Sequence, residues 1–326
     1  MKTIRKFSPE EIIFAATTEC NLHCAHCFVP RTEKRLSADD AITFLKSCAG
    51  SQIEKIGFSG GEPFLYPEFI CRVSKAAVEN DFLFGRIMTN GVWWKNPAHL
   101  EKTLSDVYDS GFDGKTGLSW DAFHGQNSEK ILTFVNTVLT AFGTQSLEIQ
   151  SVIHPDAKKD KAFLEKLESL ARHLGCTVKK NTDKKNGRGV FILESDEICI
   201  PVYREWQSFT GDDERAWKSR RWFKDDFCAG PGHVLYVHPD GNIAPCCGFA
   251  NENKALFIGK ITDSLETILK NADENKMVRL CYEKGLSKGI KLLKKRNIPI
   301  PGKTDDPCTF CDFICRELNG KEDFYD

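Results

Sequence analysis

Residues 20–27, Cys20-Asn-Leu-His-Cys24-Ala-His-Cys27, place three cysteines within one short segment of the chain. The segment follows the first apolar run, Ile12-Ile13-Phe14-Ala15-Ala16, so we expect it to form the loop after a first strand. Three thiolates on one loop can hold three irons of a [4Fe–4S] cube and leave the fourth iron without a protein ligand. That fourth iron is then open to another molecule.

The composition limits the classes of protein to consider. The chain has 326 residues, 41% of them hydrophobic, and a formal net charge of −1, which suits one large domain with a smaller second one. A nucleic-acid-binding surface is basic, whereas this chain is nearly neutral. The chain also lacks a run of about 18 uncharged apolar residues, which a membrane-spanning helix would need. The start, MKTIRKFSPEE, lacks the apolar run of a signal peptide. We therefore expect a cytoplasmic protein with small molecules or peptides as partners, and no nucleic acid or membrane.

The chain contains 14 cysteines, which in a reducing cytoplasm indicate metal ligands or reactive thiols more than disulfides. Nine of them form three groups: Cys20, Cys24 and Cys27; Cys228, Cys246 and Cys247; and Cys308, Cys311 and Cys315. The other five are scattered singly, and we expect them to behave as small buried hydrophobic residues: Cys48, Cys71, Cys176, Cys199 and Cys281.

The first two hundred residues alternate short apolar runs with amphipathic stretches. The pattern predicts strands at 11–17, 53–58, 83–88, 116–120, 146–153 and 176–180. It predicts helices at 37–49, 67–80, 97–110, 127–142 and 160–174. Strands that alternate with helices indicate an α/β fold with a parallel sheet, open or closed into a barrel, and with its functional loops at the carboxyl ends of the strands.

The alternation stops near residue 196, so we expect one domain at 1–195 and a second at 196–326. In the second part, 234–243 contains two apolar runs joined by an Asp-Gly turn, which predicts a hairpin leading to Cys246 and Cys247. We expect the lysine-rich segment 252–300 to be helical and amphipathic, with a solvated surface as the first interpretation and a peptide-docking face as the alternative.

Zinc is an alternative for the first group, because Cys20, Cys24 and Cys27 could be completed by His23 or His26. Zinc does not explain Ser59-Gly60-Gly61-Glu62-Pro63, which follows the second predicted strand. A glycine pair lets the backbone approach a ligand closely, and a carboxylate suits an ammonium group.

The three-cysteine segment followed by Gly-Gly-Glu-Pro after the next strand resembles the radical S-adenosylmethionine (SAM) enzymes, whose core is a partial, TIM-like (β/α)6 barrel. The resemblance implies that Cys20, Cys24 and Cys27 hold a [4Fe–4S] cluster. It also implies a group of residues that contact SAM: Gly60, Gly61, Glu62 and Pro63 at its amino group, and Asn90, Ser119 and Asp121 at its ribose or methionine end. In such enzymes a donor such as flavodoxin or ferredoxin supplies an electron to the cluster. The reduced cluster then cleaves SAM to a 5′-deoxyadenosyl radical, which removes an unactivated hydrogen from the substrate.

A second metal site is indicated by Cys228, Cys246, Cys308 and Cys311, whose thiolates alone suit zinc as well as iron–sulfur. After a radical SAM core, this spacing resembles the SPASM and shortened "twitch" extensions. That resemblance implies one auxiliary [4Fe–4S] cluster, with Cys315 as a possible replacement for one of the four ligands.

The doublet Cys246-Cys247 is the narrowest indication of a reaction. Adjacent residues of an extended segment point to opposite sides, so a Cys246 that faces a cluster leaves Cys247 facing away, as a candidate hydrogen-atom donor. Cys247 could instead be another ligand or a buried residue. The doublet belongs to the segment 236–247. This segment, together with residues 119–124 and 228–233, resembles the epipeptide epimerases, which invert L residues of ribosomally made peptides to D.

These features predict a radical SAM peptidyl epimerase acting on a ribosomally synthesised precursor peptide. The radical would take Hα, Cys247 would return a hydrogen to the other face, and the auxiliary cluster would help to reset the thiyl. The alternatives are thioether or carbon–carbon crosslinking, oxidation of a Ser or Cys residue, or a non-catalytic zinc-binding protein. Because only residues 1–10 precede the first strand, a peptide leader would bind the barrel mouth or the C-terminal region.

Overall fold

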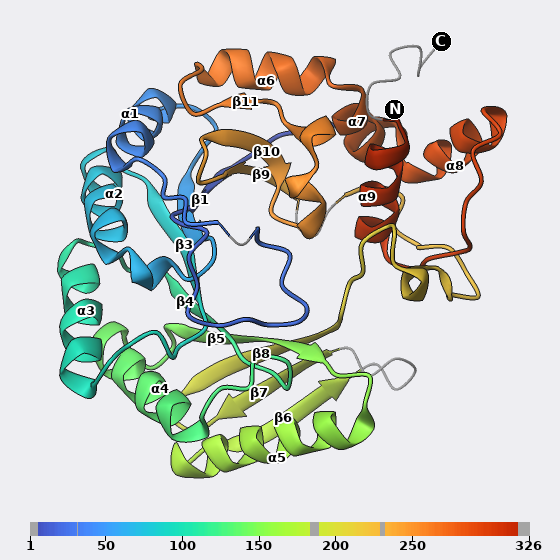
Figure 1. Cartoon of the computed structure of the whole chain (residues 1–326). Helices are drawn as coiled ribbons and strands as arrows, with labels where there is room; N and C mark the ends of the chain where they lie inside the picture. The colour runs from blue at the N-terminus through green and yellow to red at the C-terminus, as the bar shows by residue number, and fades with distance from the viewer. Residues whose placement is uncertain (1–5, 31, 183–188, 229–231, 319–326) are drawn as a thin grey trace. The chain divides into compact units, whose positions relative to one another are not determined.

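The computed structural model describes residues 6–30, 32–182, 189–228 and 232–318 (Figure 1). The chain divides into two compact units. The larger contains Phe14–Ile42 and Lys55–Gln207, and the smaller contains Met1–Ile13, Thr43–Glu54 and Ser208–Asp326. Strand β1 (Glu11–Ala15) and helix α1 (Ala38–Cys48) each have residues in both units. Within the described ranges, no helix is long and apolar enough to cross a membrane.

The larger unit has an α/β fold built on parallel strands. Five strands lie side by side in this order: β2 (Lys55–Ser59), β3 (Leu83–Thr89), β4 (Lys115–Ser119), β5 (Leu147–Ile153) and β8 (Cys199–Trp206). Two antiparallel strands follow β8: β7 (Gly189–Glu194) and then β6 (Thr177–Thr182). Among the described strands of this unit β2 and β6 do not pair, so the sheet is not closed. The prediction of a partial α/β barrel is confirmed.

The last predicted parallel strand was wrong, because β6 lies at the end of an antiparallel meander and β8 takes the place beside β5. The physical reason is burial of one face of the strand that lies beside β5. In β8, Ile200, Val202 and Arg204 are buried. The sequence of β6, TVKKNT, carries two lysines, which are typical of an edge strand.

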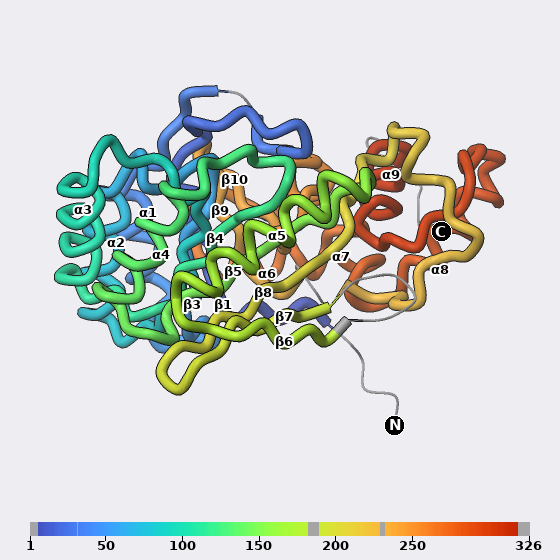
Figure 2. The backbone as a smooth tube through the Cα atoms, turned by 90° about the horizontal axis from the view of Figure 1, so that it is seen from below, coloured from blue at the N-terminus to red at the C-terminus, as the bar shows by residue number. Residues whose placement is uncertain are grey.

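Four helices follow the strands of the larger unit: α2 (Pro67–Glu79), α3 (Pro97–Asp109), α4 (Ser128–Phe142) and α5 (Ala157–His173). Side-chain caps fix where three of them begin, since Asn96, Asn127 and Asp156 accept hydrogen bonds from backbone N–H groups in the first turn. Figures 1 and 2 show α2, α3 and α4 along one face of the parallel strands. There each helix buries an apolar stripe, as α4 does with Ile131, Phe134, Val135, Val138 and Leu139.

The smaller unit contains a hairpin and a group of helices. Strands β9 (Gly232–Val237) and β10 (Asn242–Cys246) are antiparallel, which confirms the predicted hairpin, and β11 (Gly259–Lys260) pairs with β10. The α-helices are α6 (Leu265–Glu274), α7 (Lys276–Arg279), α8 (Leu286–Lys295) and α9 (Pro307–Leu318). A π-helical turn, η5 (Leu280–Lys284), lies between α7 and α8. The predicted helical segment 252–300 was wrong before residue 265, where short 3₁₀ turns and β11 occur.

Candidate functional sites

The first three cysteines lie on a loop that follows β1 and has neither helix nor strand at residues 20–27. Cys20 and Cys24 are half-buried and Cys27 is exposed. Within the loop, Cys27 N donates to Cys24 O (3.2 Å), and Leu22 N donates to Cys20 Sγ (3.4 Å). Three thiols presented this way remain within reach of a metal cluster and of whatever molecule binds beside it.

The glycine pair after β2 packs against the backbone that leads into the cysteine loop. Gly61 N donates to Thr17 O, and Glu62 N donates to Glu19 O, both at 2.7 Å. Gly60 has φ +130, and a Cβ there would lie 2.4 Å from Thr17 O; a Cβ on Gly61 would lie 2.2 Å from Glu19 O. We expected these glycines to admit a ligand. In the structure they admit the neighbouring backbone, and so they fix the glycine-rich loop against the cysteine loop.

Glu62 joins the loops after β2 and β3. Its fully buried carboxylate accepts hydrogen bonds from Phe64 N (3.2 Å), Thr89 Oγ1 (2.9 Å) and Asn90 N (2.7 Å). Burial raises the pKa of Glu62 to about 7, although the three hydrogen bonds act to lower it. A carboxylate has roughly four acceptor positions, so one remains for a cation such as an ammonium group.

The loop after β3 is tied to the cysteine loop by Asn90, which is buried. Asn90 Nδ2 donates to Asn21 Oδ1 (2.8 Å) and lies 3.7 Å from Cys20 Sγ. Gln126 was missed by the sequence analysis, yet its Nε2 donates to Asn90 O (2.9 Å) and Ser119 O (2.7 Å). Nothing in the sequence around Gln126 marks it, because its role depends on two strand ends that only the fold brings together.

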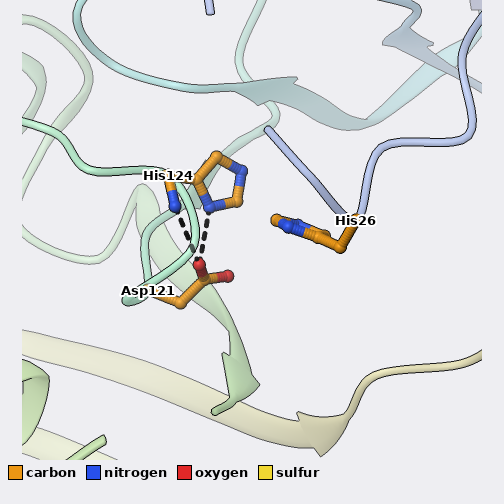
Figure 3. Close-up of side chains that lie close together, drawn as sticks. All are labelled: His26, Asp121 and His124. Carbon is orange, nitrogen blue, oxygen red and sulfur yellow. Dashed lines mark hydrogen bonds and ion pairs between the residues drawn. The ribbon is translucent and has the colours of Figure 1, made fainter. Parts of the chain in front are cut away.

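Asp121, His124 and His26 form a cluster beside these loops (Figure 3). Asp121 Oδ1 accepts from Phe123 N (2.8 Å) and lies 2.9 Å from His124 Nδ1, while Oδ2 accepts from Val152 N (3.1 Å). Burial acts to lower the pKa of His124, but hydrogen bonds to Asp121 and to Cys24 outweigh it and raise that pKa to about 9. Asp121 therefore orients His124 toward a cysteine of the loop.

The rings beside this carboxylate are also ordered. The centroid of His26 lies 4.9 Å from that of Phe123 and 4.9 Å from that of His124. The ligand atoms of His26, Asp121 and His124 lie within 4.8 Å of one another, a spacing that suits a metal ion. Oδ1 of Asp121 is already used by Phe123 N and His124 Nδ1, so an ion could reach this carboxylate only at Oδ2, which accepts from Val152 N. Ser119, at the end of β4, is half-buried.

These residues fit an iron–sulfur cluster with one open iron and an amino acid-like ligand. The donor set offers three thiols on one loop, as such a cluster needs. Beside it, Glu62 provides a buried carboxylate with an acceptor position left.

The smaller unit gathers six further thiols. Cys246, Cys281 and Cys315 are buried, and Cys228, Cys308 and Cys311 are half-buried. The last three cysteines of the sequence, at positions i, i+3 and i+7 of α9, share one face of that helix. Burial raises the pKa of Cys228 to about 11. Residues 229–231, part of the segment that resembles the epimerases, lie outside the described residues.

Cys281 was expected to be an isolated buried residue, but its Sγ lies 3.5 Å from Cys311 Sγ. Of the other single cysteines, Cys48 and Cys176 are buried as expected, whereas Cys199 is exposed and that expectation was wrong. The doublet at the end of β10 divides as the alternation of an extended segment requires: Cys246 is 7% exposed and Cys247 is an exposed residue.

Comparison with known families agrees with this geometry. Residues 15–133 match the model of the radical SAM superfamily, and residues 228–298 match SPASM, an iron–sulfur cluster-binding domain. The chain thus contains a radical SAM domain followed by a SPASM domain, and it is a radical SAM enzyme. Its cofactors are SAM and a [4Fe–4S] cluster, with auxiliary iron–sulfur in the SPASM domain.

Individual relatives are distant in sequence. The chain is 22% identical over 326 residues to the putative peptide biosynthesis protein YydG of Bacillus subtilis, covering 94% of this chain and 92% of that one. It is 23% identical over 296 residues to GTP 3′,8-cyclase of Helicobacter pylori, covering 80% and 88%. The solved structure "Native anSMEcpe with bound AdoMet and Cp18Cys peptide" has the same fold, with a TM-score of 0.52, 14% identity and 83% of each chain covered.

Proposed function

We propose that this radical SAM enzyme modifies a ribosomally synthesised precursor peptide by inverting an L residue to D. A peptide substrate is supported by the similarity to YydG, a putative peptide biosynthesis protein, along 94% of the chain. A one-electron protein such as flavodoxin or ferredoxin would be the second partner, because the chemistry starts with reduction of a cluster.

The observation that carries epimerisation is the opposite exposure of two adjacent thiols. Cys246 is buried with the other cysteines of the smaller unit, so it suits a cluster ligand. Cys247 is exposed, which suits a thiol that meets a substrate. A peptide epimerase needs such a donor, since inversion requires a hydrogen atom delivered to the face opposite the one that lost it.

The remaining roles follow from the contacts. Cys20, Cys24 and Cys27 would hold the cluster of the radical SAM domain. Gly60, Gly61, Glu62 and Pro63 would bind the amino group of SAM, with Asn90, Ser119 and Asp121 along the rest of that molecule. Within this set, Asn90 and Asp121 also hold the cysteine loop, since Asn90 Nδ2 reaches Asn21 and Asp121 directs His124 toward Cys24. Cys228, Cys246, Cys308 and Cys311 would hold one auxiliary [4Fe–4S] cluster.

When bound, the cluster and SAM supply a radical able to remove a hydrogen atom from an unactivated carbon. The substrate residue, having lost Hα, is a planar carbon radical. The Cys247 thiol gives its hydrogen atom to the other face, which forms the C–H bond of the D residue and leaves a thiyl. One electron from the protein donor and one proton from solvent restore the thiol.

Turnover in D2O tests the proposal directly. Thiols exchange their hydrogen with solvent, so an inverted residue should carry one deuteron at Cα. The peptide to use is one encoded by a short open reading frame next to the gene, with chiral analysis after hydrolysis and mass spectrometry of the intact product. A D residue that retains only protium at Cα would contradict hydrogen return from a thiol.

A substitution identifies the donor. Cys247→Ala should still produce 5′-deoxyadenosine but no D residue, because abstraction precedes hydrogen return. The matched control is Cys199→Ala, which removes another exposed thiol, from β8 of the larger unit. Normal epimerisation by Cys247→Ala would show that Cys247 is not the donor.

Other peptide modifications are separated by mass. Thioether or carbon–carbon crosslinking, and oxidation of a Ser or Cys residue, change the peptide mass, whereas epimerisation in H2O leaves it unchanged. The similarity to GTP 3′,8-cyclase makes a nucleotide the substrate to assay in parallel. A colourless anaerobic preparation that contains zinc and no iron would instead support a non-catalytic zinc-binding protein.

A further inference from the structure

Cys281 lies inside the auxiliary thiol group without belonging to the spacing pattern that predicted it. Its side chain is 3% exposed, and its Sγ lies 3.5 Å from Cys311 Sγ, within the range of a sulfur hydrogen bond. Cys315, one turn further along α9, also hydrogen-bonds Cys311. Cys311 is therefore flanked by two thiols.

The π-helical turn η5 holds Cys281 in this place. Cys281 O accepts from Cys228 N (3.0 Å), and the next side chain, Tyr282 Oη, donates to Pro245 O (2.8 Å). Tyr282 also hydrogen-bonds Cys228. One short turn thus contacts the segments that carry Cys228, Cys246 and Cys311. π-Helical turns are rare and occur frequently at functional sites.

We propose that Cys281 donates an S–H···S hydrogen bond to Cys311 and thereby raises the reduction potential of the auxiliary cluster, an inference that rests on the proposed role of Cys311 as a ligand. Cys281 is then a positioning residue and not a fifth ligand. Two cysteines bound to different irons of a cube have the cube between them, whereas these two sulfurs are in direct contact at 3.5 Å.

The chemistry of a ligand sets the direction of donation. A cysteine that binds iron is a thiolate and has no hydrogen to give, so in this 3.5 Å contact the hydrogen comes from Cys281. Hydrogen bonds to cluster sulfurs are one of the factors that set iron–sulfur potentials. A donor stabilises the more negative, reduced cluster more than the oxidised one, so its loss lowers the potential.

The test uses the full chain carrying Cys20→Ala, Cys24→Ala and Cys27→Ala, so that only the auxiliary cluster assembles, and it needs no peptide. In this background Cys281→Ala, Cys281→Ser and Cys48→Ala are compared after anaerobic reconstitution. Cys48 is fully buried in the same unit and serves as the matched control. Iron and sulfide content are measured first, and the midpoint potential is then measured by EPR-monitored titration.

We expect about four irons per chain in all three variants. The midpoint potential should be more negative in Cys281→Ala, nearer to the parent in Cys281→Ser, which keeps a hydroxyl donor, and unchanged in Cys48→Ala. Loss of iron from Cys281→Ser would make Cys281 a ligand and overturn the proposal, as would an unchanged potential in Cys281→Ala. If Cys281→Ala does not fold, Cys281→Val fills the space without a donor and is held to the same expectation.

One more variant separates this inference from the assignment beneath it. Cys311→Ala should lose the auxiliary cluster. Retention of about four irons would remove Cys311 from the ligand set, and with it the proposed hydrogen bond. None of these measurements depends on whether the peptide product is a D residue.

Discussion

The two cysteine groups of this chain are held in opposite ways. Cys20, Cys24 and Cys27 lie on a loop without helix or strand, and Cys27 is exposed. The six thiols gathered in the smaller unit come from a loop, a strand, a π-helical turn and an α-helix. Three of them, Cys246, Cys281 and Cys315, are buried, and the other three are half-buried. A cluster on the open loop stays accessible to SAM and substrate, whereas a cluster in the second group is enclosed by protein.

We infer that the surroundings of the thiols, beyond their number, distinguish the proposed catalytic cluster from the proposed auxiliary one. Around the open loop the protein supplies fixed polar contacts, such as those of Glu62 and Asn90. Around the second group it supplies further thiols and backbone.

The largest effect is expected from the open loop. Replacing Cys20, Cys24 and Cys27 by alanine should reduce cleavage of SAM to the background rate and remove about four irons per chain, while the auxiliary irons remain. The quantities to measure are 5′-deoxyadenosine and total iron. The matched control replaces three cysteines elsewhere in the larger unit, Cys71, Cys176 and Cys199. SAM cleavage at the normal rate in the triple variant would exclude the loop as the cluster site.

Removing the auxiliary cluster should affect the fold more than the start of the chemistry. Cys308→Ala should lose the auxiliary irons and make residues 208–318 more sensitive to proteases, because metal binding to such a site contributes to folding. A loss of only about 1.4 kcal/mol raises the open population tenfold. Limited proteolysis with mass mapping reports this, with Cys48→Ala as the control. An equal increase of proteolytic cleavage in the larger and smaller units would contradict an effect on folding that is confined to the smaller unit.

How far the sequence predicts the molecule depends on the range of the interactions. Periodicity and caps are local, so helix α2 was predicted at 67–80 and found at Pro67–Glu79. The order of β6, β7 and β8 was not predicted, because the choice of a neighbour for β5 depends on segments about 50 residues apart. Local patterns fix the elements, and tertiary packing decides between parallel and antiparallel neighbours.

The candidate sites show the same limit. The spacing of Cys20, Cys24 and Cys27 lies within eight residues and could be read directly. Cys281 and Cys311 are 30 residues apart, and their contact exists only because η5 and α9 pack together. The sequence singled out Gly60 and Gly61 as residues that admit a ligand. That their backbone packs against Thr17 and Glu19 could be learned only from the structure.

A smaller effect, confined to the larger unit, is expected at Gly61. In Gly61→Ala the new Cβ would meet Glu19 O, so the loops must move apart at a cost of about 2 kcal/mol. SAM cleavage should fall with it, because the glycine-rich loop loses its fixed place beside the cysteine loop. Gly175→Ala is the control: its φ of +66 costs about 1 kcal/mol, but nothing lies within 4 Å, so SAM cleavage should be unchanged.

The two measurements separate stability from positioning. Urea midpoints give the cost of each alanine, and the rate of SAM cleavage under folded conditions gives its effect on the site. An equal loss of SAM cleavage in both variants would mean that the close approach of Gly61 to Glu19 is not what aligns the loops.

A separate effect, measured without any cofactor, concerns charge, and here the two sites should differ in their ionisation just above neutral pH. Burial raises the pKa of Glu62 to about 7 from 4.5 and the pKa of Cys228 to about 11. Before any cofactor binds, Glu62 is therefore ionised by pH 8 while Cys228 is still neutral. A raised carboxyl pKa means that the folded protein binds more protons than the unfolded chain between pH 4.5 and 7, so stability falls as the pH rises through that range.

Glu62→Gln tests this sign, because glutamine stays neutral. Without SAM or clusters, the variant should gain stability relative to the parent between pH 5 and pH 8, by up to about 3 kcal/mol. The measurement is the difference in urea midpoint between the two proteins at each pH. If the difference in urea midpoint between Glu62→Gln and the parent is the same at pH 5 and at pH 8, ionisation of Glu62 does not destabilise the fold. A gain would mean that the larger unit accepts a less stable fold in order to hold a negative charge ready for a cation, whereas the Cys228 thiol of the smaller unit stays neutral.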